Sequence, residues 1–510
     1  MKTLSFILLI FSSLTVFAND CSLLKEDYPV LAGGRVKPFY VLAKESIKFL
    51  TGKSKFQDES PNKTFCRLLQ QSQTGTTLSL PLLVEHIESK KLLGVVEAQN
   101  SAPVRELVTK KDLVRSEIFK QKENNSYKKD LNKIWARIDM YEKIVAGTAF
   151  KIYNGPASLT ATLPPGEKDI IDSSEWITYS EIPTESIDET LKNAEKNYLS
   201  RYDDDHQLEL SFTKSHIFSY AMFTALIGIF LTVLSKNMIW GIALALITVG
   251  IEIAGLTMRV LISGRAPITN MYETVLFSGF GALVISLLVL FFKKDKMFLL
   301  AGLGYNILCL FMMMFANNML DSSISPLVPV LRDNFWLSTH VTTIILSYAA
   351  LALSWMVANI TLIRMRFGTL SKADYRYYQD LTYTCIKIGI VLLAAGIILG
   401  GVWADYSWGR FWGWDPKETW SLIVLLFYMV IVHGRYSSWI DTHRFIVLSA
   451  AGFMSVMMAW FGVNYILASG LHSYGFSEGG AIFLGSFFLV QTIIILICGS
   501  KKTFKKVATP

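Results

Sequence analysis

The sequence predicts an all-α polytopic membrane protein with about nine transmembrane helices, preceded by a signal peptide and an exported soluble domain of mixed or uncertain class. Three observations lead to this prediction. The 510 residues are 52% hydrophobic and only 18% charged, with a mean hydropathy of +0.37, which is a membrane-protein composition. Apolar runs fill the chain from residue 214 to residue 500, whereas residues 19–213 are polar and mixed in charge. The chain also begins with the pattern of an export signal.

Residues 1–18 have the layout of a secretory signal peptide. Lys2 supplies a short positive region, an apolar run follows, and small Ala18 precedes polar Asn19. Cleavable export signals are built in this order. We therefore expect the mature chain to begin near Asn19 and residues 19–213 to form an exported domain.

One helix of the exported domain is predicted clearly. In residues 127–145 the apolar side chains recur at the spacing of one helical face. The face consists of Leu131, Ile134, Ile138, Tyr141 and Val145. The segment is therefore expected to be an amphipathic helix.

The five cysteines exclude two classes of protein. Cys309, Cys385 and Cys498 lie in apolar runs, where buried small apolar residues are expected. Cys21 and Cys66 lie in the exported domain, and the sequence leaves open whether they form a disulfide. No C-x-x-C occurs anywhere. The chain is therefore neither a thioredoxin-like thiol donor nor itself a cytochrome c, because covalent haem attachment needs C-x-x-C-H.

Nine apolar runs are long enough to cross a hydrocarbon core of ~30 Å, which takes roughly 20 helical residues. The expected spans are 215–235, 238–260, 273–292, 297–316, 339–363, 384–403, 419–438, 445–468 and 480–499. We divide the chain into the first transmembrane helix at 214–235, a larger membrane domain at 236–500 and a basic cytoplasmic tail at 501–510.

The positive charges predict the orientation of these helices. If the exported domain is outside, the loops after odd-numbered helices are cytoplasmic, and those loops and their flanks carry most of the lysines and arginines. From the second helix onward the outer side has only Arg259, Arg265, Arg332, Arg410 and Lys417. This bias agrees with the signal peptide. It predicts a multi-pass inner (cytoplasmic) membrane protein with its N-terminal domain on the periplasmic or outer side. The net charge of +8 then reflects topology and indicates no nucleic-acid partner.

Tryptophan is concentrated between the sixth and seventh helices, at the outer face. Five of the twelve tryptophans fall within residues 403–420, namely Trp403, Trp408, Trp412, Trp414 and Trp420. One interpretation is an aromatic belt that anchors a helical hairpin at the membrane interface. The other is a platform that covers a large flat apolar ligand, because each aromatic side chain buries of order 150 Å² or more. Composition alone only slightly favours the platform.

Two histidines strengthen the platform interpretation. His340 lies at the outer mouth of the fifth helix and His472 in the last outer loop. A single histidine at an interface is usually only a polar tip, but two on the face that carries the tryptophans are better explained together as axial ligands of a haem iron. Each would bind as neutral imidazole and would need a partner for its other ring nitrogen.

His433 is predicted to lie at a different depth in the membrane from His340 and His472. It follows the predicted start of the seventh helix by 14 residues, which places it ~20 Å deeper at ~1.5 Å per residue, close to the cytoplasmic side. It is either an interfacial residue beside Arg435 or an inner ligand at which haem made in the cytoplasm first binds.

Four stretches of the sequence resemble one protein family. "WGRFWGWD" followed by Glu418 matches the W-G-x-x-W-x-W-D-x-x-E motif of the haem-handling proteins of cytochrome c biogenesis. "GRAPITNMYETVLF" from Gly264, "WLSTHV" around His340 and "GLHSYGF" around His472 resemble the CcsA (ResC-type) member of the system II haem lyase. The match covers roughly residues 240–490.

The resemblance implies a haem site and assigns residues to it. His340 and His472 look like the two external iron ligands, and His433 looks like the transmembrane histidine of an inner site. The tryptophan motif implies that haem is bound by Trp408, Gly409, Trp412, Trp414, Asp415 and Glu418, and the stretch after Gly264 adds Arg265 and Asn270. The cofactor implied is haem b (iron protoporphyrin IX), bound non-covalently.

The resemblance also implies an activity and partners. Family members are thought to move haem from the cytoplasmic side to the outer tryptophan-rich site and to present it for thioether attachment to C-x-x-C-H of an apocytochrome c. The implied partners are a CcsB (ResB)-like membrane protein, the apocytochrome c and a thiol-reducing protein, within the lipid bilayer. Two alternatives remain: a haem exporter or binding protein without ligation activity, as the CcmC and CcmF types suggest, or a membrane cytochrome b that carries electrons.

Elementary chemistry assigns roles within the tryptophan segment. Haem propionates need cations near water, for which Arg410, Lys417, Arg265 and Arg332 are the outer-face candidates. Asp415 and Glu418 would repel propionates. We expect Asp415 instead to cap the seventh helix, with Pro416 at its first position and Glu418 in its first turn.

No catalytic nucleophile is expected in this chain. Thiols that add to vinyl groups need orientation, reduced iron and exclusion of water more than a general base. Glu252 and Arg259 of the second helix are seven residues apart on one helical face. Ionisable groups at that depth are expected to face the bundle interior.

Overall fold

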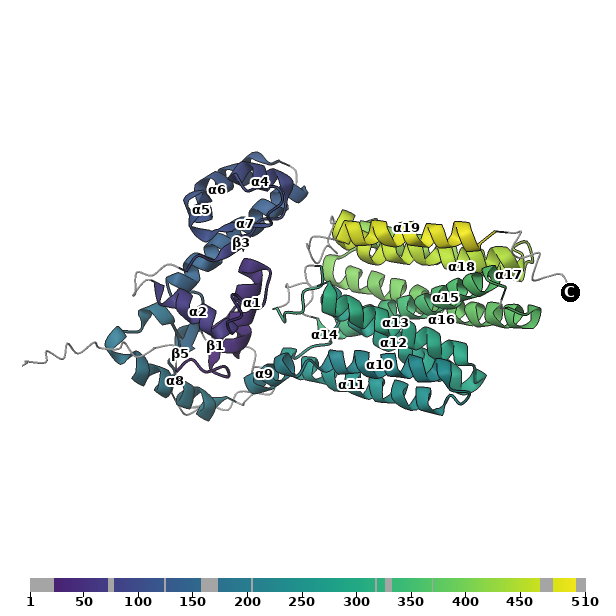
Figure 1. The fold of residues 1–510 in the computed structure, drawn as a ribbon, viewed down its shortest axis with the longest axis horizontal. Coiled ribbons are helices and arrows are strands. Elements are labelled where there is room, and N and C mark those ends of the chain that lie inside the picture. Colours follow the sequence, from purple (N-terminus) through teal and green to yellow (C-terminus); the bar gives the residue numbers. More distant parts are fainter. Residues whose placement is uncertain are drawn as a thin grey trace, which may run out of the picture. The chain divides into compact units, whose positions relative to one another are not determined.

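The computed structural model describes residues 23–71, 78–122, 125–156, 173–202, 205–316, 319–325, 333–368, 370–467 and 480–500. The chain forms two compact units, which divide between Leu210 and Ser211. Figure 1 shows the elements of each unit. The predicted signal peptide, residues 1–18, lies outside the described residues.

The first unit combines helices with short antiparallel strands. One sheet has the order β2-β1-β5-β6, and β3 pairs with β4 in a second sheet. The strands are β1 (Pro29–Ala32), β2 (Arg35–Pro38), β3 (Pro81–Leu83), β4 (Ser101–Pro103), β5 (Lys151–Tyr153) and β6 (Trp176–Thr178). The helices are α1 (Phe39–Thr51), α2 (Pro61–Leu69), α4 (Ile87–Leu93), α5 (Val104–Thr109), α6 (Lys111–Lys120), α7 (Ser126–Val145), α8 (Ile187–Arg201) and α9 (Asp205–Ser215), which crosses the boundary between the units.

Helix α7 runs through the core of this unit. Its bounds confirm the predicted amphipathic helix, and the predicted face is buried apart from Val145, which is half-buried. Arg137 projects from α7 and is only 5% exposed. It donates to the carbonyl oxygens of Phe49 (3.1 Å) and Leu83 (2.7 Å) and to the Glu85 carboxylate (3.3 Å). One buried guanidinium therefore ties α7 to α1 and β3.

The cysteines behave differently in the two units. Cys66 is disulfide-bonded, and Cys21 lies outside the described residues. In the second unit Cys309, Cys385 and Cys498 are free and buried, which confirms that they pack as small apolar residues.

The second unit is a bundle of long helices. They are α10 (Ile217–Leu234), α11 (Ile239–Ser263), α12 (Met271–Lys293), α13 (Lys296–Phe315), α14 (Asn334–Trp336), α15 (Thr342–Arg366), α16 (Lys372–Trp408), α17 (Pro416–Tyr436), α18 (Thr442–Met457) and α19 (Gly480–Cys498). Two π-helical segments interrupt the α-helical pattern: η6 (Leu337–Val341) joins α14 to α15, and η7 (Met458–Leu467) extends α18. The long helices lie side by side, with their axes roughly horizontal in the view of Figure 1. We call the end of the bundle where α16 ends and α17 begins the tryptophan end.

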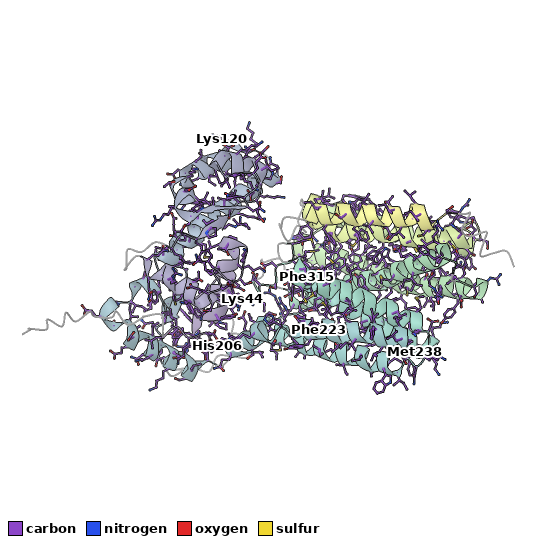
Figure 2. The ribbon with its side chains drawn as sticks, viewed as in Figure 1. Lys44, Lys120, His206, Phe223, Met238 and Phe315 are labelled. Atoms are coloured by element: carbon purple, nitrogen blue, oxygen red, sulfur yellow. The ribbon has the colours of Figure 1, made fainter. Side chains whose placement is uncertain are left out.

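The surface of the bundle confirms a multi-pass membrane protein. Within the described ranges nine helices are long and apolar enough to cross a membrane, and they overlap the nine predicted spans. Large apolar side chains project outward from them, among them Phe223 and Phe315 (Figure 2), which are 58% and 65% exposed. Exposed apolar surface on this scale is unfavourable in water and is expected where lipid surrounds the protein.

Candidate functional site

The connection between α16 and α17 carries the tryptophan motif. Gly409 ends α16 with φ +66°, and its N–H donates to the Asp405 carbonyl. Glycine adopts this left-handed conformation without steric cost, so it is favoured directly after a helix. The chain then passes through residues 410–414 and enters α17 at Pro416.

The two acidic residues of the motif build the start of α17. The Asp415 carboxylate accepts from the backbone N–H groups of Lys417 and Glu418, both at 2.9 Å. The Glu418 carboxylate accepts in return from the N–H groups of Gly413 (2.7 Å) and Asp415 (3.3 Å). Pro416 occupies the first turn. This capping box confirms the expected placement of the acids and satisfies N–H groups that a helix start leaves unpaired.

Trp414 has an unusual backbone conformation between these hydrogen bonds. Its φ is +57°, in a region that bulky residues rarely occupy. Glu418 binds the N–H groups on both sides of it, at Gly413 and Asp415, so the conformation is fixed by the acid. As a result the Trp414 side chain is 69% exposed and stands edge-on to Trp412, with ring centroids 5.8 Å apart and an interplanar angle of 85°.

His340 lies on the side of α16, at the same end of the bundle. Asp333 starts its helix by accepting from the N–H groups of Phe335 and Trp336, and His340 follows within π-helical η6. Its Nδ1 hydrogen-bonds the Gly396 carbonyl oxygen at 2.8 Å. When Nδ1 donates to a backbone carbonyl, Nε2 is the nitrogen that can face a metal, and the ring orientation is set.

Glycines on α16 make room for this histidine. A Cβ atom at Gly400 would lie 2.5 Å from His340 Cε1, and one at Gly396 would lie 2.6 Å from Ile344 Cδ1. Gly401 receives the ring of Phe411 in the same way, at 2.5 Å. The glycines therefore allow the helix that carries His340 and the tryptophan loop to pack against neighbouring positions of α16.

Trp403 completes the surroundings of His340. The centroids of the two rings are 5.8 Å apart, and Trp403 is 6% exposed in a cluster with Leu337, Trp336 and Val341. The haem-binding tryptophans that the resemblance implies are Trp408, Trp412 and Trp414 without Trp403, so the contact between His340 and Trp403 was missed. The available signal was the position of Trp403 five residues before Trp408 in the same predicted outer segment.

Two indole N–H groups are buried at the tryptophan end. Nε1 of Trp403 and Nε1 of Trp412 have no hydrogen-bond partner among the residues that the structure describes. Buried donors are usually satisfied, so both indoles offer a hydrogen bond to a ligand that brings an acceptor.

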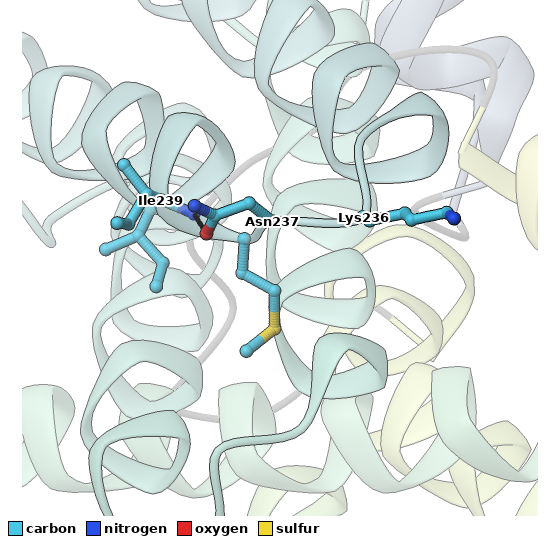
Figure 3. Close-up of a pocket in the computed structure, with 5 residues that line it drawn as sticks. Lys236, Asn237 and Ile239 are labelled. Atoms are coloured by element: carbon cyan, nitrogen blue, oxygen red, sulfur yellow. Dashed lines mark hydrogen bonds between the residues drawn. The ribbon is translucent and has the colours of Figure 1, made fainter.

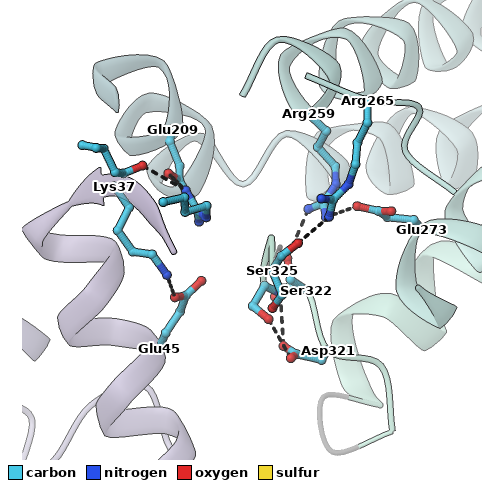
Figure 4. A network of polar contacts seen from close by, with 12 residues as sticks. Lys37, Glu45, Glu209, Arg259, Arg265, Glu273, Asp321, Ser322 and Ser325 are labelled. Atoms are coloured by element: carbon cyan, nitrogen blue, oxygen red, sulfur yellow. Dashed lines mark hydrogen bonds and ion pairs between the residues drawn. The ribbon is translucent and has the colours of Figure 1, made fainter. Parts of the chain in front are cut away.

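The predicted cations of the outer face, and Asn270, lie in different local environments. The Arg410 guanidinium lies against Gly413, whose missing side chain provides the space. Arg265 donates to the Ser325 carbonyl at 2.6 Å (Figure 4). Asn270 caps α12 by accepting from the Glu273 N–H at 2.9 Å. Lys417 is half-buried in the first turn of α17.

The second-helix pair faces the interior as predicted, but the two residues have different partners. Arg259 is 1% exposed and donates to Glu273 at 2.5 Å and to the Ser322 carbonyl at 3.2 Å (Figure 4). Glu252 is bonded to Asn306 on α13.

His433 lies at the opposite end of the bundle. It belongs to the last turn of α17, about 26 Å from Pro416 at ~1.5 Å per residue. Nδ1 bonds the Met429 carbonyl at 2.8 Å within the helix, and the side chain is exposed. A ligand or a second protein can therefore reach it from the surface of the bundle.

Two predicted site residues, His472 and Arg332, lie outside the described residues. The structure therefore places His340 near the tryptophan loop and His433 away from it. A shallow pocket of ≈ 470 Å³ at the turn between α10 and α11, lined by Lys236, Asn237, Met238, Ile239 and Ile242 (Figure 3), contains none of the predicted site residues.

Comparisons with known proteins identify relatives of this chain. Residues 268–472 match the family model of the cytochrome C assembly protein. Protein NrfI of Wolinella succinogenes is 28% identical over 491 residues, which cover 86% of this chain and 53% of NrfI. The cytochrome c biogenesis protein CcsA of Guillardia theta is 34% identical over 239 residues, which cover 42% of this chain and 78% of that protein. The chain thus spans about half the length of NrfI and most of the Guillardia protein.

A solved structure, the cytochrome c haem lyase CcmF, is also similar. It has a TM-score of 0.40 and 17% sequence identity, and the match covers 56% of this chain and 50% of that chain.

Proposed function

We propose a haem-delivery function for this chain, which belongs to the CcsA family of cytochrome c biogenesis proteins. It binds haem b non-covalently, moves it from the cytoplasmic side to the tryptophan end on the outer face, and presents it for attachment to C-x-x-C-H of an apocytochrome c. It is the haem-delivering subunit of a holocytochrome c synthase, in the inner membrane.

One observation carries this proposal. His340 is oriented by the Gly396 carbonyl and packed against Trp403, at the end of the bundle where a capping box holds the tryptophan loop. An imidazole with one nitrogen anchored by a carbonyl is the usual arrangement of a histidine that binds a metal. Aromatic side chains that surround it suit a flat apolar macrocycle. His472 is the proposed second ligand.

The tryptophan end also carries hydrogen-bond donors and a positive charge for the haem propionates. The buried indole N–H groups of Trp403 and Trp412 have no partner among the described residues and would donate to haem propionates. Arg410 supplies positive charge in the same loop. The bound haem supplies the iron and the two vinyl groups, while the protein orients them and keeps water away.

The exposed position of His433 supports an inner site that a second protein completes. His433 would offer one ligand to haem at the cytoplasmic end, and its open face leaves the other to a CcsB-like partner. The apocytochrome and a thiol-reducing protein are the other proposed partners.

Co-expression tests the proposal. The chain is produced with a CcsB-like partner and an apocytochrome c that carries C-x-x-C-H, and covalent haem is measured on the cytochrome by haem stain. We expect covalent haem with wild type and very little with a chain in which Trp408, Trp412 and Trp414 are all alanine. If that variant loads haem at the tryptophan end and still supports full maturation, the loop has no part in delivery.

The same experiment separates the alternatives. A haem exporter would release haem to the outside without any dependence of attachment on the tryptophan loop. A membrane cytochrome b would hold haem and support no cytochrome c maturation at all.

A further inference from the structure

Glu252 is a buried carboxyl group in the middle of α11. It lies 13 residues after the first residue of a 25-residue helix that has membrane-spanning length and composition. Glu252 is 0% exposed. An ionised carboxylate in such a place is unfavourable unless a cation or several donors compensate it.

Two other buried glutamates, Glu273 and Glu209, have that compensation. Glu273 accepts from Arg259 (2.5 Å) and from the N–H and O–H of Thr269 (both 2.8 Å). Glu209, in the first unit, accepts two bonds from the Arg35 guanidinium, both at 2.6 Å (Figure 4). These contacts are those of ionised carboxylates.

Glu252 has a single neutral donor instead. Asn306 on α13, also 0% exposed, donates from Nδ2 to Glu252 Oε1 at 2.8 Å. Gly279 on α12 lets α13 approach closely near this pair, because a Cβ there would lie 2.8 Å from the Cβ of Cys309. Among the described residues no cation contacts Glu252.

Both residues also retain one buried atom without a partner. Glu252 Oε2 and Asn306 Oδ1 have no hydrogen bond within the described part of the chain. If Glu252 were ionised, both atoms would be acceptors, and neither could satisfy the other. A proton on Oε2 turns this oxygen into a donor, which can then hydrogen-bond to Asn306 Oδ1.

Within the described residues, the polar groups that neighbour Glu252 do not favour the anion. On α13, Tyr305 bonds Ser278 of α12 at 3.0 Å, and Cys309 is free and buried. On α10, Thr224 bonds Thr248 of α11 at 2.8 Å. Arg259 lies about two turns further along α11, and its charge is paired with that of Glu273 in the first turn of α12.

We infer that Glu252 is a proton-binding site inside the membrane bundle, where it holds one proton that it shares with Asn306 and thereby joins α11 to α13 through a neutral acid–amide pair. The ligand of this site is the proton alone. Loss of that proton leaves a buried anion beside a single amide, so the contact between α11 and α13 weakens as the pH rises.

Infrared spectroscopy of the purified full chain in H₂O and D₂O tests the inference. Wild type should show the C=O band of a protonated carboxylic acid, shifted on deuteration, and Glu252→Gln should lack it. Glu273→Gln is the matched control, since it removes a buried glutamate that is ionised, and it should keep the band. If Glu252→Gln does not fold, Glu252→Met, which is uncharged and of similar length, replaces it.

Thermal unfolding adds a second readout. The unfolding temperature of wild type should fall at alkaline pH more than that of Glu252→Gln, whose side-chain amide keeps a hydrogen bond to Asn306 and cannot ionise. The inference is overturned if Glu252→Gln keeps the protonated band and instead loses carboxylate absorption, or if both chains lose stability in parallel as the pH rises.

Discussion

The Nδ1 atom of His340 lies 2.8 Å from the carbonyl oxygen of Gly396, so a backbone group of α16 sets the orientation of a histidine on the neighbouring helix. The ring rests on Gly400 of the same helix face. The proposed iron ligand is thus positioned by two residues that have no side chain.

Replacing Gly400 with alanine should therefore displace His340. The new Cβ would lie 2.5 Å from Cε1, and the ring would have to move. We expect roughly a tenfold loss of haem affinity, in the range seen when the groups that orient metal ligands are changed. Titration of the purified chain with haem measures this.

Gly250→Ala is the control for that substitution. It adds the same methyl group to a membrane helix at a position with nothing within 4 Å. It should leave haem affinity unchanged. Equal losses in both variants would mean that Gly400 does not act through His340.

Asp415 at the start of α17 should contribute through its hydrogen-bond acceptor oxygen rather than through its negative charge. Asp415→Asn retains a side-chain oxygen that can cap the helix, whereas Asp415→Ala removes it at a cost of about 1 kcal/mol. We expect cytochrome c maturation to survive in the asparagine variant and to fall in the alanine variant. Equal loss in both variants would assign a role to the negative charge itself.

Trp412→Phe should separate ligand binding from stability. Nε1 of Trp412 has no partner within the described residues, so the N–H contributes no hydrogen bond to the haem-free protein. The substitution keeps an aromatic ring and should change the unfolding temperature of the haem-free chain little. Haem retention during purification should decrease. Unchanged retention would show that this N–H does not contact haem.

Arg137 should be essential to the first unit. Arg137→Leu leaves two carbonyl groups and Glu85 without their buried donor, and we expect a loss of about 3–5 kcal/mol in unfolding free energy. Protease sensitivity of the first unit in the full chain checks this. Arg67→Leu is the control: it breaks an ion pair with Glu59 whose arginine is 42% exposed, and it should leave the protease sensitivity unchanged, because exposed ion pairs contribute little to stability.

Local features of the fold could be predicted well from the sequence. The capping role of Asp415 depends only on residues 415–418, and the membrane spans follow from unbroken apolar runs. The bounds were less accurate where polar residues extend a helix. The sixth span was predicted at 384–403, while α16 runs from Lys372 to Trp408, because its polar first turns continue the helix beyond the apolar run.

Contacts between helices could not be predicted in the same way. The pairing of His340 with Gly396 and Trp403 depends on the register between α15 and α16 and on the π-helical turn at Leu337–Val341. π-Helical turns have no reliable sequence signal and are often found at functional sites. The partner of Glu252 was likewise hidden, because Asn306 comes from a helix 54 residues away in sequence.

The most direct test of the haem-delivery account is the absorption spectrum of the chain purified with its CcsB-like partner, compared between wild type and His340→Ala. His216→Asn serves as control, since His216 is also exposed at the tryptophan end and its φ of +48° suits asparagine. The account predicts a bis-histidine b-type spectrum in wild type and in the control, and loss of the outer haem and of cytochrome c maturation in His340→Ala. Full haem content and full maturation in His340→Ala would contradict it.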